Sequence, residues 1–169
     1  MTDNATLMQN ALYCAAYCEE NVWHLLGEMI EAKVPSQAVI VTNPTASVLY
    51  FQQRAAPESY LCWDYHVFAK SADCVLDLDH RDGIPISVAD YLAGSFPAAN
   101  GWPDDLRPRF LSLAATDYRL RFSSDRRHMQ RGGAWLVPPP SWPCTGEGHN
   151  LAELLEEARE TGRPLEQWP

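Results

Sequence analysis

Two short stretches rich in aromatic and branched residues, 61–69 (LCWDYHVFA) and 74–79 (CVLDLD), flank the turn-like tetrapeptide KSAD. This pattern predicts a β-hairpin. If the turn is centred on the middle of the tetrapeptide, His66 on the first strand lies directly opposite Asp77 on the second. Opposed residues have Cβ atoms about 4.5 to 5.5 Å apart, so an imidazole can reach a carboxylate with a hydrogen bond. A three-residue turn would instead place His66 opposite Leu78.

An amphipathic helix is predicted for residues 19–33 (EENVWHLLGEMIEAK), and its first turn is acidic, as helix starts prefer. Its apolar residues recur at intervals of three and four: Val22, Leu25, Leu26, Met29 and Ile30. Cys18 therefore lies at the helix N-terminus, where free backbone N–H groups and the positive dipole end favour thiolate and can hold an oxyanion. Because Glu19 and Glu20 oppose the shift towards thiolate, we expect His66 to contribute more of it.

Cys18, His66 and Asp77 together supply a thiol, an imidazole and a carboxylate. A cysteine-dependent acyl-transfer enzyme needs these groups as the nucleophile, as the base that later protonates the leaving group, and as the group that orients the base. Asp79 competes with Asp77 for the third role, because both lie on the same strand face. The remaining cysteines are expected to be small buried core residues: Cys14, Cys62, Cys74 and Cys144.

Length and charge limit the kind of protein and partner. The chain has 169 residues, of which 46% are hydrophobic, and this predicts one domain with a packed core. Its formal charge of -9 at pH 7 argues against a nucleic acid or an anionic membrane as a partner. We expect a monomer.

Cysteine usage and the N-terminus indicate the compartment. The chain has 5 cysteines, an odd number in a sequence long enough to fold without disulfides, which indicates free thiols in a reducing environment. No apolar run approaches the roughly 18 residues that span a membrane. Residues 1–10 (MTDNATLMQN) lack a basic region followed by an apolar one, so they do not form a secretory signal. We expect a cytoplasmic protein, shared with the nucleus if the source is eukaryotic. The sequence has no Gly-rich phosphate loop, and we expect no cofactor.

The rest of the chain mixes helices and strands that do not strictly alternate. Strands are predicted at 37–42, 47–51 and 109–114, and helices at 87–95, 117–122 and 150–161. In the last helix, Asn150 is the expected N-cap and Glu153 its capping-box partner. Four prolines stiffen the loop 132–148. This order favours an α+β fold, a single domain 1–169 with a mostly antiparallel sheet flanked by helices, over a doubly wound parallel sheet.

Five blocks of the sequence resemble, in the same order, the protein N-terminal glutamine amidohydrolase family: YCEENVW (17–23), WDYHV (63–67), VLDLD (75–79), FSSDRRHM (122–129) and PPPSWPC (138–144). The resemblance implies an enzyme that deamidates the N-terminal glutamine of proteins and peptides to glutamate and releases ammonia, as one step of the N-degron route to degradation. It implies that Cys18 is the catalytic cysteine, His66 the histidine and Asp77 the aspartate. It also implies an architecture similar to that of papain-like and transglutaminase-like cysteine hydrolases.

Residues around the proposed site are candidates for contacts with the substrate. Tyr13, Tyr17 and Trp63 flank the site and either line a pocket for the glutamine side chain or pack in the core. The α-ammonium group of the substrate is expected to pair with Asp64, on the strand face of His66, or with Asp125 in the fourth block.

Other functions are open to the same residues. A papain-like peptidase, or a transglutaminase-like cross-linker or general protein glutamine deamidase, would use the triad on another amide or acceptor. A non-catalytic adaptor would only bind N-terminal residues. The residue types of a Cys3His zinc site are also present, in Cys14, Cys18, Cys62 and His66. However, positions 62 and 66 on one strand lie about 13 Å apart, so we expect no metal.

Overall fold

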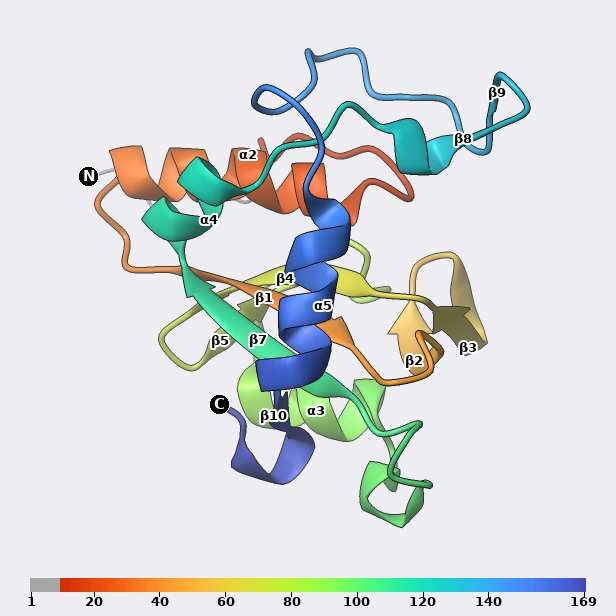
Figure 1. The fold of residues 1–169 in the computed structure, drawn as a ribbon. Coiled ribbons are helices and arrows are strands. Elements are labelled where there is room, and N and C mark those ends of the chain that lie inside the picture. Colours follow the sequence, from red (N-terminus) through yellow and green to blue (C-terminus); the bar gives the residue numbers. More distant parts are fainter. Residues whose placement is uncertain (1–9) are drawn as a thin grey trace.

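A six-stranded antiparallel sheet forms the centre of the computed structural model, which describes residues 10–169 (Figure 1). The strand order is β10-β7-β1-β4-β5-β6, and each neighbouring pair is antiparallel. The strands are β1 (Gln37–Thr42), β4 (His66–Ser71), β5 (Cys74–Leu76), β6 (Ile86–Ser87), β7 (Arg109–Ala114) and β10 (Arg163–Pro164). The predicted combination of helices with an antiparallel sheet is confirmed.

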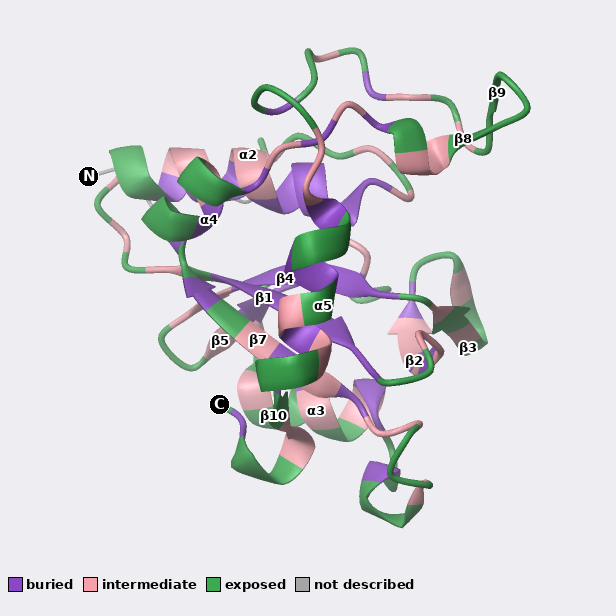
Figure 2. Ribbon diagram, in the orientation of Figure 1, coloured by how far each residue is buried: buried purple, intermediate pink, exposed green. Residues whose placement is uncertain are grey.

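Helices pack on both faces of the sheet because its central strands are apolar on both sides. In β1, Ala38 and Ile40 belong to one buried cluster, whereas Val39 and Val41 belong to another. The first cluster lies under α2 (Cys18–Glu31), α4 (Ala115–Arg121) and α5 (Leu151–Thr161), and the second includes residues of α3 (Val88–Ser95). Figure 2 shows the central strands buried between these layers. Burial of these two apolar faces stabilises the fold.

Smaller elements complete the structure. Strands β2 (Val48–Gln53) and β3 (Ala56–Trp63) form a separate antiparallel pair, as do β8 (Gln130–Arg131) and β9 (Ala134–Trp135). The short 3-10 helices are η1 (Ala99–Gly101), η2 (Arg127–Met129) and η3 (Leu165–Gln167). In Figure 1 the β8–β9 hairpin projects from the body of the molecule, on the side of α2.

The predicted continuous strand 61–69 is wrong. Its first part belongs to β3, which pairs with β2, and only at His66 does the chain join the main sheet as β4. Between them, the Asp64 carboxylate accepts a hydrogen bond from the backbone N–H of Tyr65 at 3.1 Å. Such local side-chain bonds compete with strand pairing, which explains the break.

The predicted hairpin register is also wrong, by two residues. Ser71 pairs with Cys74, so the turn consists of Ala72 and Asp73 alone, and Ala72 has a φ of 48°. Positive φ values are usual in two-residue hairpin turns because they match the twist of the strands. Since β5 ends at Leu76, the carboxylates beyond it lie outside the ladder.

Several predicted elements match the structure, and one cap does not. The helix predicted from residue 19 begins at Cys18, and β1 and β7 have the predicted bounds. Asn150 is the N-cap residue of α5, as predicted, but its side chain makes no capping bond. Instead it accepts a hydrogen bond from the N–H of Ser123 and donates one to the carbonyl of Arg121. Asn150 therefore links α5 to the segment after α4, and the predicted capping box is wrong.

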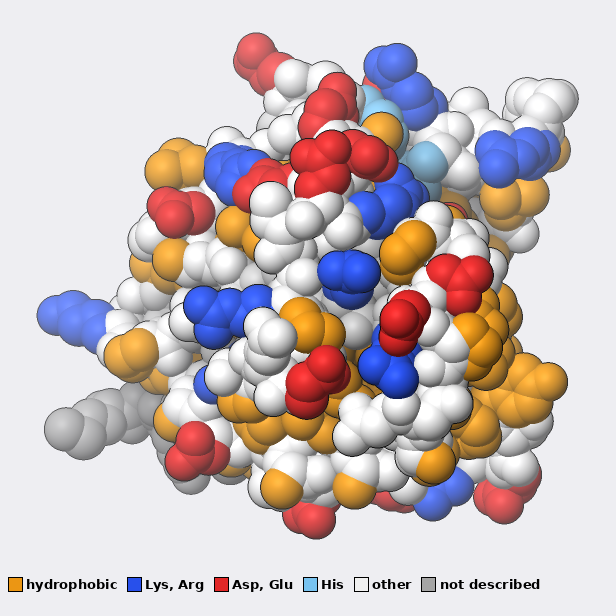
Figure 3. All heavy atoms as spheres, turned by 60° about the horizontal axis from the view of Figure 1, so that its bottom comes forward, with side chains coloured by type: hydrophobic (Ala, Val, Ile, Leu, Met, Phe, Trp, Pro, Cys, Tyr) orange, Lys and Arg blue, Asp and Glu red, His pale blue; other side chains and the backbone are white. Residues whose placement is uncertain are grey.

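No helix within residues 10–169 is long and apolar enough to cross a membrane. On the face shown in Figure 3, basic and acidic side chains are interspersed. Residues 1–9, which belong to the segment predicted not to form a secretory signal, lie outside the described residues.

Candidate active site

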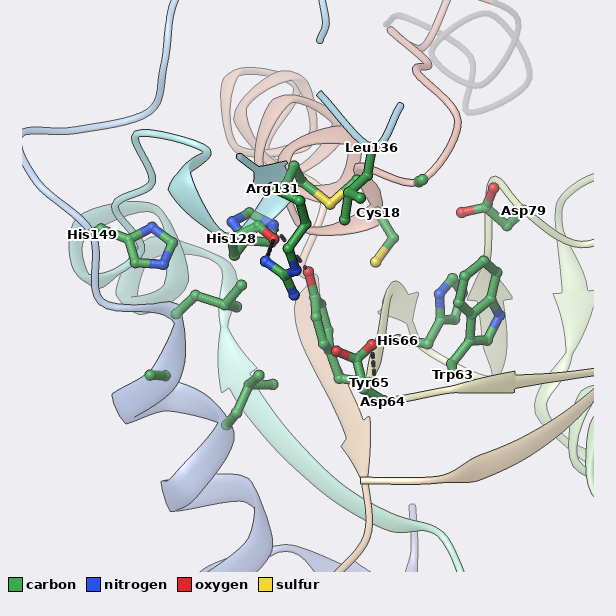
Figure 4. Close-up of a pocket in the computed structure, with 15 residues that line it drawn as sticks. Cys18, Trp63, Asp64, Tyr65, His66, Asp79, His128, Arg131, Leu136 and His149 are labelled. Atoms are coloured by element: carbon green, nitrogen blue, oxygen red, sulfur yellow. Dashed lines mark hydrogen bonds between the residues drawn. The ribbon is translucent and has the colours of Figure 1, made fainter. Parts of the chain in front are cut away.

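A cavity of about 490 Å³ opens where β4 begins, and Cys18 and His66 both line it. In Figure 4 the thiol of Cys18 points towards the ring of His66. The wall also contains Trp63, Asp64, Tyr65, Asp79, His128, Arg131, Leu136 and His149. The cavity therefore lies between the N-terminus of α2, the start of β4 and the segment around β8 and β9.

Cys18 is the first residue of α2 and is 8% exposed. Its thiol donates a weak hydrogen bond to the carboxylate of Glu19, at 3.5 Å. Burial, followed by the charges of Glu19 and Asp79, raises the pKa of the Cys18 thiol, while the backbone N–H of Val67 lowers it. This direction is opposite to the one expected from the helix terminus alone, because desolvation of a buried thiolate outweighs the helix dipole.

Cys18 also differs from the other free cysteines. It is buried, Cys14 and Cys74 are half-buried, and Cys62 and Cys144 are exposed. The expectation of buried core residues is therefore wrong for Cys62 and Cys144.

His66 and Asp77 form a buried pair, in which the Nε2–H of His66 donates to Oδ1 of Asp77 at 2.9 Å. The two residues are 2% and 0% exposed. The contact forms although the register that predicted it is wrong. After β5 ends, the Asp77 carboxylate accepts a hydrogen bond from the backbone N–H of Asp79 at 3.0 Å. This tight turn brings the carboxylate to the imidazole without a place in the ladder.

The second oxygen of Asp77 is held by two residues to which the sequence analysis assigned no role. Tyr91 of α3 donates its hydroxyl to Oδ2 of Asp77 at 2.8 Å, and Gln53 of β2 donates from Nε2 at 3.3 Å. Tyr50 in turn lies 2.8 Å from Tyr91, hydroxyl to hydroxyl. Gln53 lies two residues beyond the predicted strand 47–51, and Tyr91 lies within the predicted helix 87–95. No pattern in the sequence indicated that Tyr91 would contact Asp77.

These bonds set the charges of the pair. Burial alone would raise the pKa of Asp77, but His66 and the hydrogen bond from Tyr91 lower it below its ordinary value. Burial alone would lower the pKa of His66, but the charge and hydrogen bond of Asp77 raise it. Asp77 is thus ionised at neutral pH. Nδ1 of His66, a residue of the cavity wall, has no hydrogen-bond partner among the described residues.

Two of the predicted substrate-contact residues lie in the cavity wall. Trp63 stacks near the ring of His66, with an interplanar angle of 13° and ring centroids 6.4 Å apart. Asp64 is exposed and also lines the cavity. Tyr13 is not part of the cavity wall, but its hydroxyl donates to Asp79 of the wall at 2.7 Å.

The other two lie elsewhere. Tyr17 is fully buried, and its hydroxyl donates to the carbonyl of Val137 at 3.0 Å. Asp125 pairs with Arg127 and with His149 rather than lining the cavity. Tyr17 therefore anchors the loop after β9, the second of the two roles considered for it.

One group of residues within 10–169 has ligand atoms close enough to hold a metal ion: His66, Asp77 and Asp79, all within 4.8 Å of one another. It contains no cysteine. The carboxylate of Asp77 already accepts four hydrogen bonds, which a metal would have to displace.

Comparisons with known proteins identify the family of the chain. The sequence profile of the N-terminal glutamine amidase family matches residues 13–166. The chain belongs to the N-terminal glutamine amidase family. It is 35% identical over 152 residues to a protein named "Protein N-terminal glutamine amidohydrolase" from Drosophila ananassae, covering 82% of this chain and 74% of that one. The same values hold for the protein of that name from Drosophila virilis. It is also 35% identical, over 144 residues, to the protein of that name from Drosophila pseudoobscura pseudoobscura. That match covers 78% of this chain and 70% of the relative.

In this member of the amidase family, some of the five family-like blocks supply residues of the site, and the others contact the helix that begins at Cys18. Blocks 17–23, 63–67 and 75–79 supply Cys18 and the His66–Asp77 pair. Block 122–129 supplies His128, whose Nε2 lies 3.1 Å from a carboxylate oxygen of Glu19. Sequence reasoning identified this block but did not assign a role to His128.

The last block, 138–144, is held against α2 by a buried ion pair. Arg126 donates two hydrogen bonds of 2.8 Å to the carboxylate of Glu20, and another of 2.8 Å to the carbonyl of Trp142. The indole of Trp142 also donates to Glu20, at 2.8 Å. Through Arg126 and Trp142, Glu20 thus connects the helix that begins at Cys18 to the loop 138–144.

We expect Arg126→Gln to lower the free energy of unfolding by about 3–5 kcal/mol, because it leaves the charge of Glu20 buried without its partner. Urea unfolding followed by fluorescence measures this change. Arg127→Gln, which removes an exposed arginine paired with Asp125, is the matched control and should cost far less. Equal losses in the two variants would contradict a structural role for the buried pair.

Proposed function

We propose that this chain hydrolyses the side-chain carboxamide of an N-terminal glutamine in proteins and peptides, producing N-terminal glutamate and ammonia. The observation that carries the proposal is the buried His66–Asp77 hydrogen bond in the same cavity as the Cys18 thiol. The family membership and the printed name of its relatives support the substrate. Cys18 acts as the nucleophile, His66 as the base and acid, and Asp77 orients His66.

In the first step, Sγ of Cys18 attacks the carboxamide carbon while the thiol proton passes to Nδ1 of His66. This order suits a thiol whose pKa is raised by burial, because the proton leaves as the bond forms. In the first turn of α2 the N–H groups of Glu20 and Asn21 are bound to the carbonyl of Tyr17. The N–H groups of Cys18 and Glu19 therefore hold the developing oxyanion. The C–N bond then breaks, His66 returns its proton to the departing nitrogen, and ammonia leaves a γ-glutamyl thioester on Cys18.

In the second step, water attacks the thioester and gives a proton to His66. The C–S bond breaks, and the proton returns to the sulfur of Cys18, so that one water is consumed and one ammonia released overall. Asp77 keeps Nε2 of His66 protonated and stabilises the imidazolium form in both steps. Trp63 and Asp64 lie in the wall that faces the substrate.

The cellular setting that we infer follows from the chemistry of the chain. All 5 cysteines are free, which supports a reducing cytosol. A nucleophile at the start of a helix and a histidine on an antiparallel sheet support an architecture of the papain-like or transglutaminase-like kind. The product, an N-terminal glutamate, fits a step in the N-degron route.

A set of matched peptides tests the proposal. A Gln-initiated peptide should gain about one mass unit and release ammonia without chain cleavage. An Asn-initiated peptide should react about 100-fold more slowly, since its carboxamide is one methylene short and misplacement by ~1 Å can cost that much. Acetyl-Gln and Gly-Gln peptides should react poorly, because the free α-ammonium is missing or displaced.

The same experiment separates the rival functions. Chain cleavage would indicate a peptidase, and incorporation of an added amine would indicate a transglutaminase. Comparable rates on internal glutamine would indicate a general protein deamidase. Binding of the Gln peptide without ammonia release would indicate an adaptor.

A further inference from the structure

Resting on the proposed function, we propose that Asp79 binds the α-ammonium group of the substrate and so selects glutamine at position one. Asp79 lines the same cavity as Cys18 and His66. One of its carboxylate oxygens lies within 4.8 Å of a ring nitrogen of His66. The α-nitrogen of glutamine is four bonds from the carboxamide carbon, at most about 5 Å at standard bond lengths. The length of a glutamine side chain is thus comparable to the separation between Asp79 and His66, which lines the same cavity as Cys18.

The carboxylate of Asp79 is held in position but lacks a cationic partner. The hydroxyl of Tyr13 donates to Oδ1, and among residues 10–169 no lysine, arginine or histidine forms an ion pair with Asp79. The guanidinium of Arg54 lies instead over the ring of Tyr13, 4.8 Å from its centroid. One oxygen of Asp79 thus has no donor among the described side chains.

The neighbouring acids are already paired. Asp77 is bound by His66 and Tyr91, and Glu19 accepts a hydrogen bond from Tyr65 at 3.1 Å. Burial of Asp79 and the charge of Asp77 raise its pKa, against the opposing effects of His66, the hydrogen bond from Tyr13 and Arg54. The net upward shift is that of a carboxylate without a directly paired counter-charge. A bound ammonium group would supply that charge.

Asp64 is the alternative acid in the wall. It is exposed, and one of its oxygens accepts from the next backbone N–H, that of Tyr65. An ammonium–carboxylate pair in open water contributes little, whereas a pair that is partly shielded contributes more. Asp79, which is only partly exposed, is therefore the better partner.

Substrate binding at Asp79 would also act on the nucleophile. The negative charge of Asp79 helps to raise the pKa of the Cys18 thiol. An α-ammonium group next to Asp79 cancels that charge and makes the thiol easier to ionise. An acetylated or internal glutamine lacks this effect as well as the ion pair.

The test compares two substrates across four proteins: the wild type and the variants Asp79→Asn, Asp64→Asn and Asp105→Asn. Asp105 is an exposed aspartate outside the cavity wall and controls for loss of one negative charge. The substrates are a Gln-initiated peptide and the same peptide with the α-amine replaced by a hydroxyl. Ammonia release gives kcat/KM for each, and their ratio measures the preference for the ammonium group.

The wild type should prefer the amine by about 10- to 100-fold, as expected for a hydrogen bond to a charged group. Asp79→Asn should bring the ratio close to one, while Asp64→Asn and Asp105→Asn keep it. In the substrate-free protein, Asp79→Asn should also speed alkylation of Cys18 by iodoacetamide. If Asp79→Asn does not fold, Tyr13→Phe serves in its place and should lower the ratio several-fold.

An unchanged ratio in a folded Asp79→Asn variant, or its loss in Asp64→Asn, would overturn the assignment while leaving the proposed function intact. A wild type that releases no ammonia from the Gln peptide would overturn both.

Discussion

Cys18→Ser is expected to abolish ammonia release from a Gln-initiated peptide, lowering turnover by up to about 10⁶-fold, as for removal of other catalytic nucleophiles. A hydroxyl is a much weaker nucleophile than a thiol at neutral pH. Burial and Glu19 already raise the pKa of the Cys18 thiol, so the site offers no extra stabilisation that would help a serine to ionise. Single-turnover assays with mass detection of the acyl-enzyme measure this effect.

Cys14→Ser is the matched control. The Cys14 thiol lies 3.8 Å from the carbonyl of Pro138, and Cys14 is absent from the cavity wall. The variant should keep most of the activity. Equal loss in both variants, with folding intact by circular dichroism, would contradict a nucleophilic role confined to Cys18.

Asp77→Asn is expected to keep the fold but to lower kcat by about 10⁴-fold, the loss known for the corresponding change in a serine protease triad. An amide stabilises imidazolium poorly and can donate to Nε2 of His66, which would place the proton on the nitrogen that must receive it from Cys18. The hydrogen bonds from Tyr91 and Gln53 would also have to rearrange. Steady-state rates on the Gln peptide give the loss.

The two substrates used for Asp79 separate the roles of the neighbouring aspartates. Asp77→Asn should slow the amine and hydroxyl substrates alike, because it acts through His66. Asp79→Asn should slow mainly the amine substrate. If Asp79→Asn instead slowed both by about 10⁴-fold, Asp79 rather than Asp77 would be the residue that orients His66.

Local sequence patterns were sufficient to predict the helix that begins at Cys18 and the strands β1 and β7. Apolar residues at helical or alternating spacing specify which side of an element is buried, and this is a property of neighbouring positions. The order of sequence blocks was sufficient to identify the family, now supported by the profile over residues 13–166. Both kinds of signal are contained in short segments.

The β4–β5 hairpin shows that local sequence patterns do not predict strand pairing. The composition of 61–69 is typical of a strand, yet a side-chain bond at Asp64 ends β3 and lets His66 join another sheet. The His66–Asp77 contact was expected from a register that does not occur. It forms because a turn after β5 returns the carboxylate to the imidazole.

The sequence by itself determined the residue types of the candidate site, the helix that presents Cys18 and the family of the chain. Only the tertiary structure decided that Asp79 enters the cavity, that Tyr91 and Gln53 hold Asp77, and that the pKa of Cys18 rises. These properties depend on burial and on hydrogen bonds between elements far apart in the chain. Desolvation and long-range contacts arise only once the layers pack together, so no local pattern encodes them.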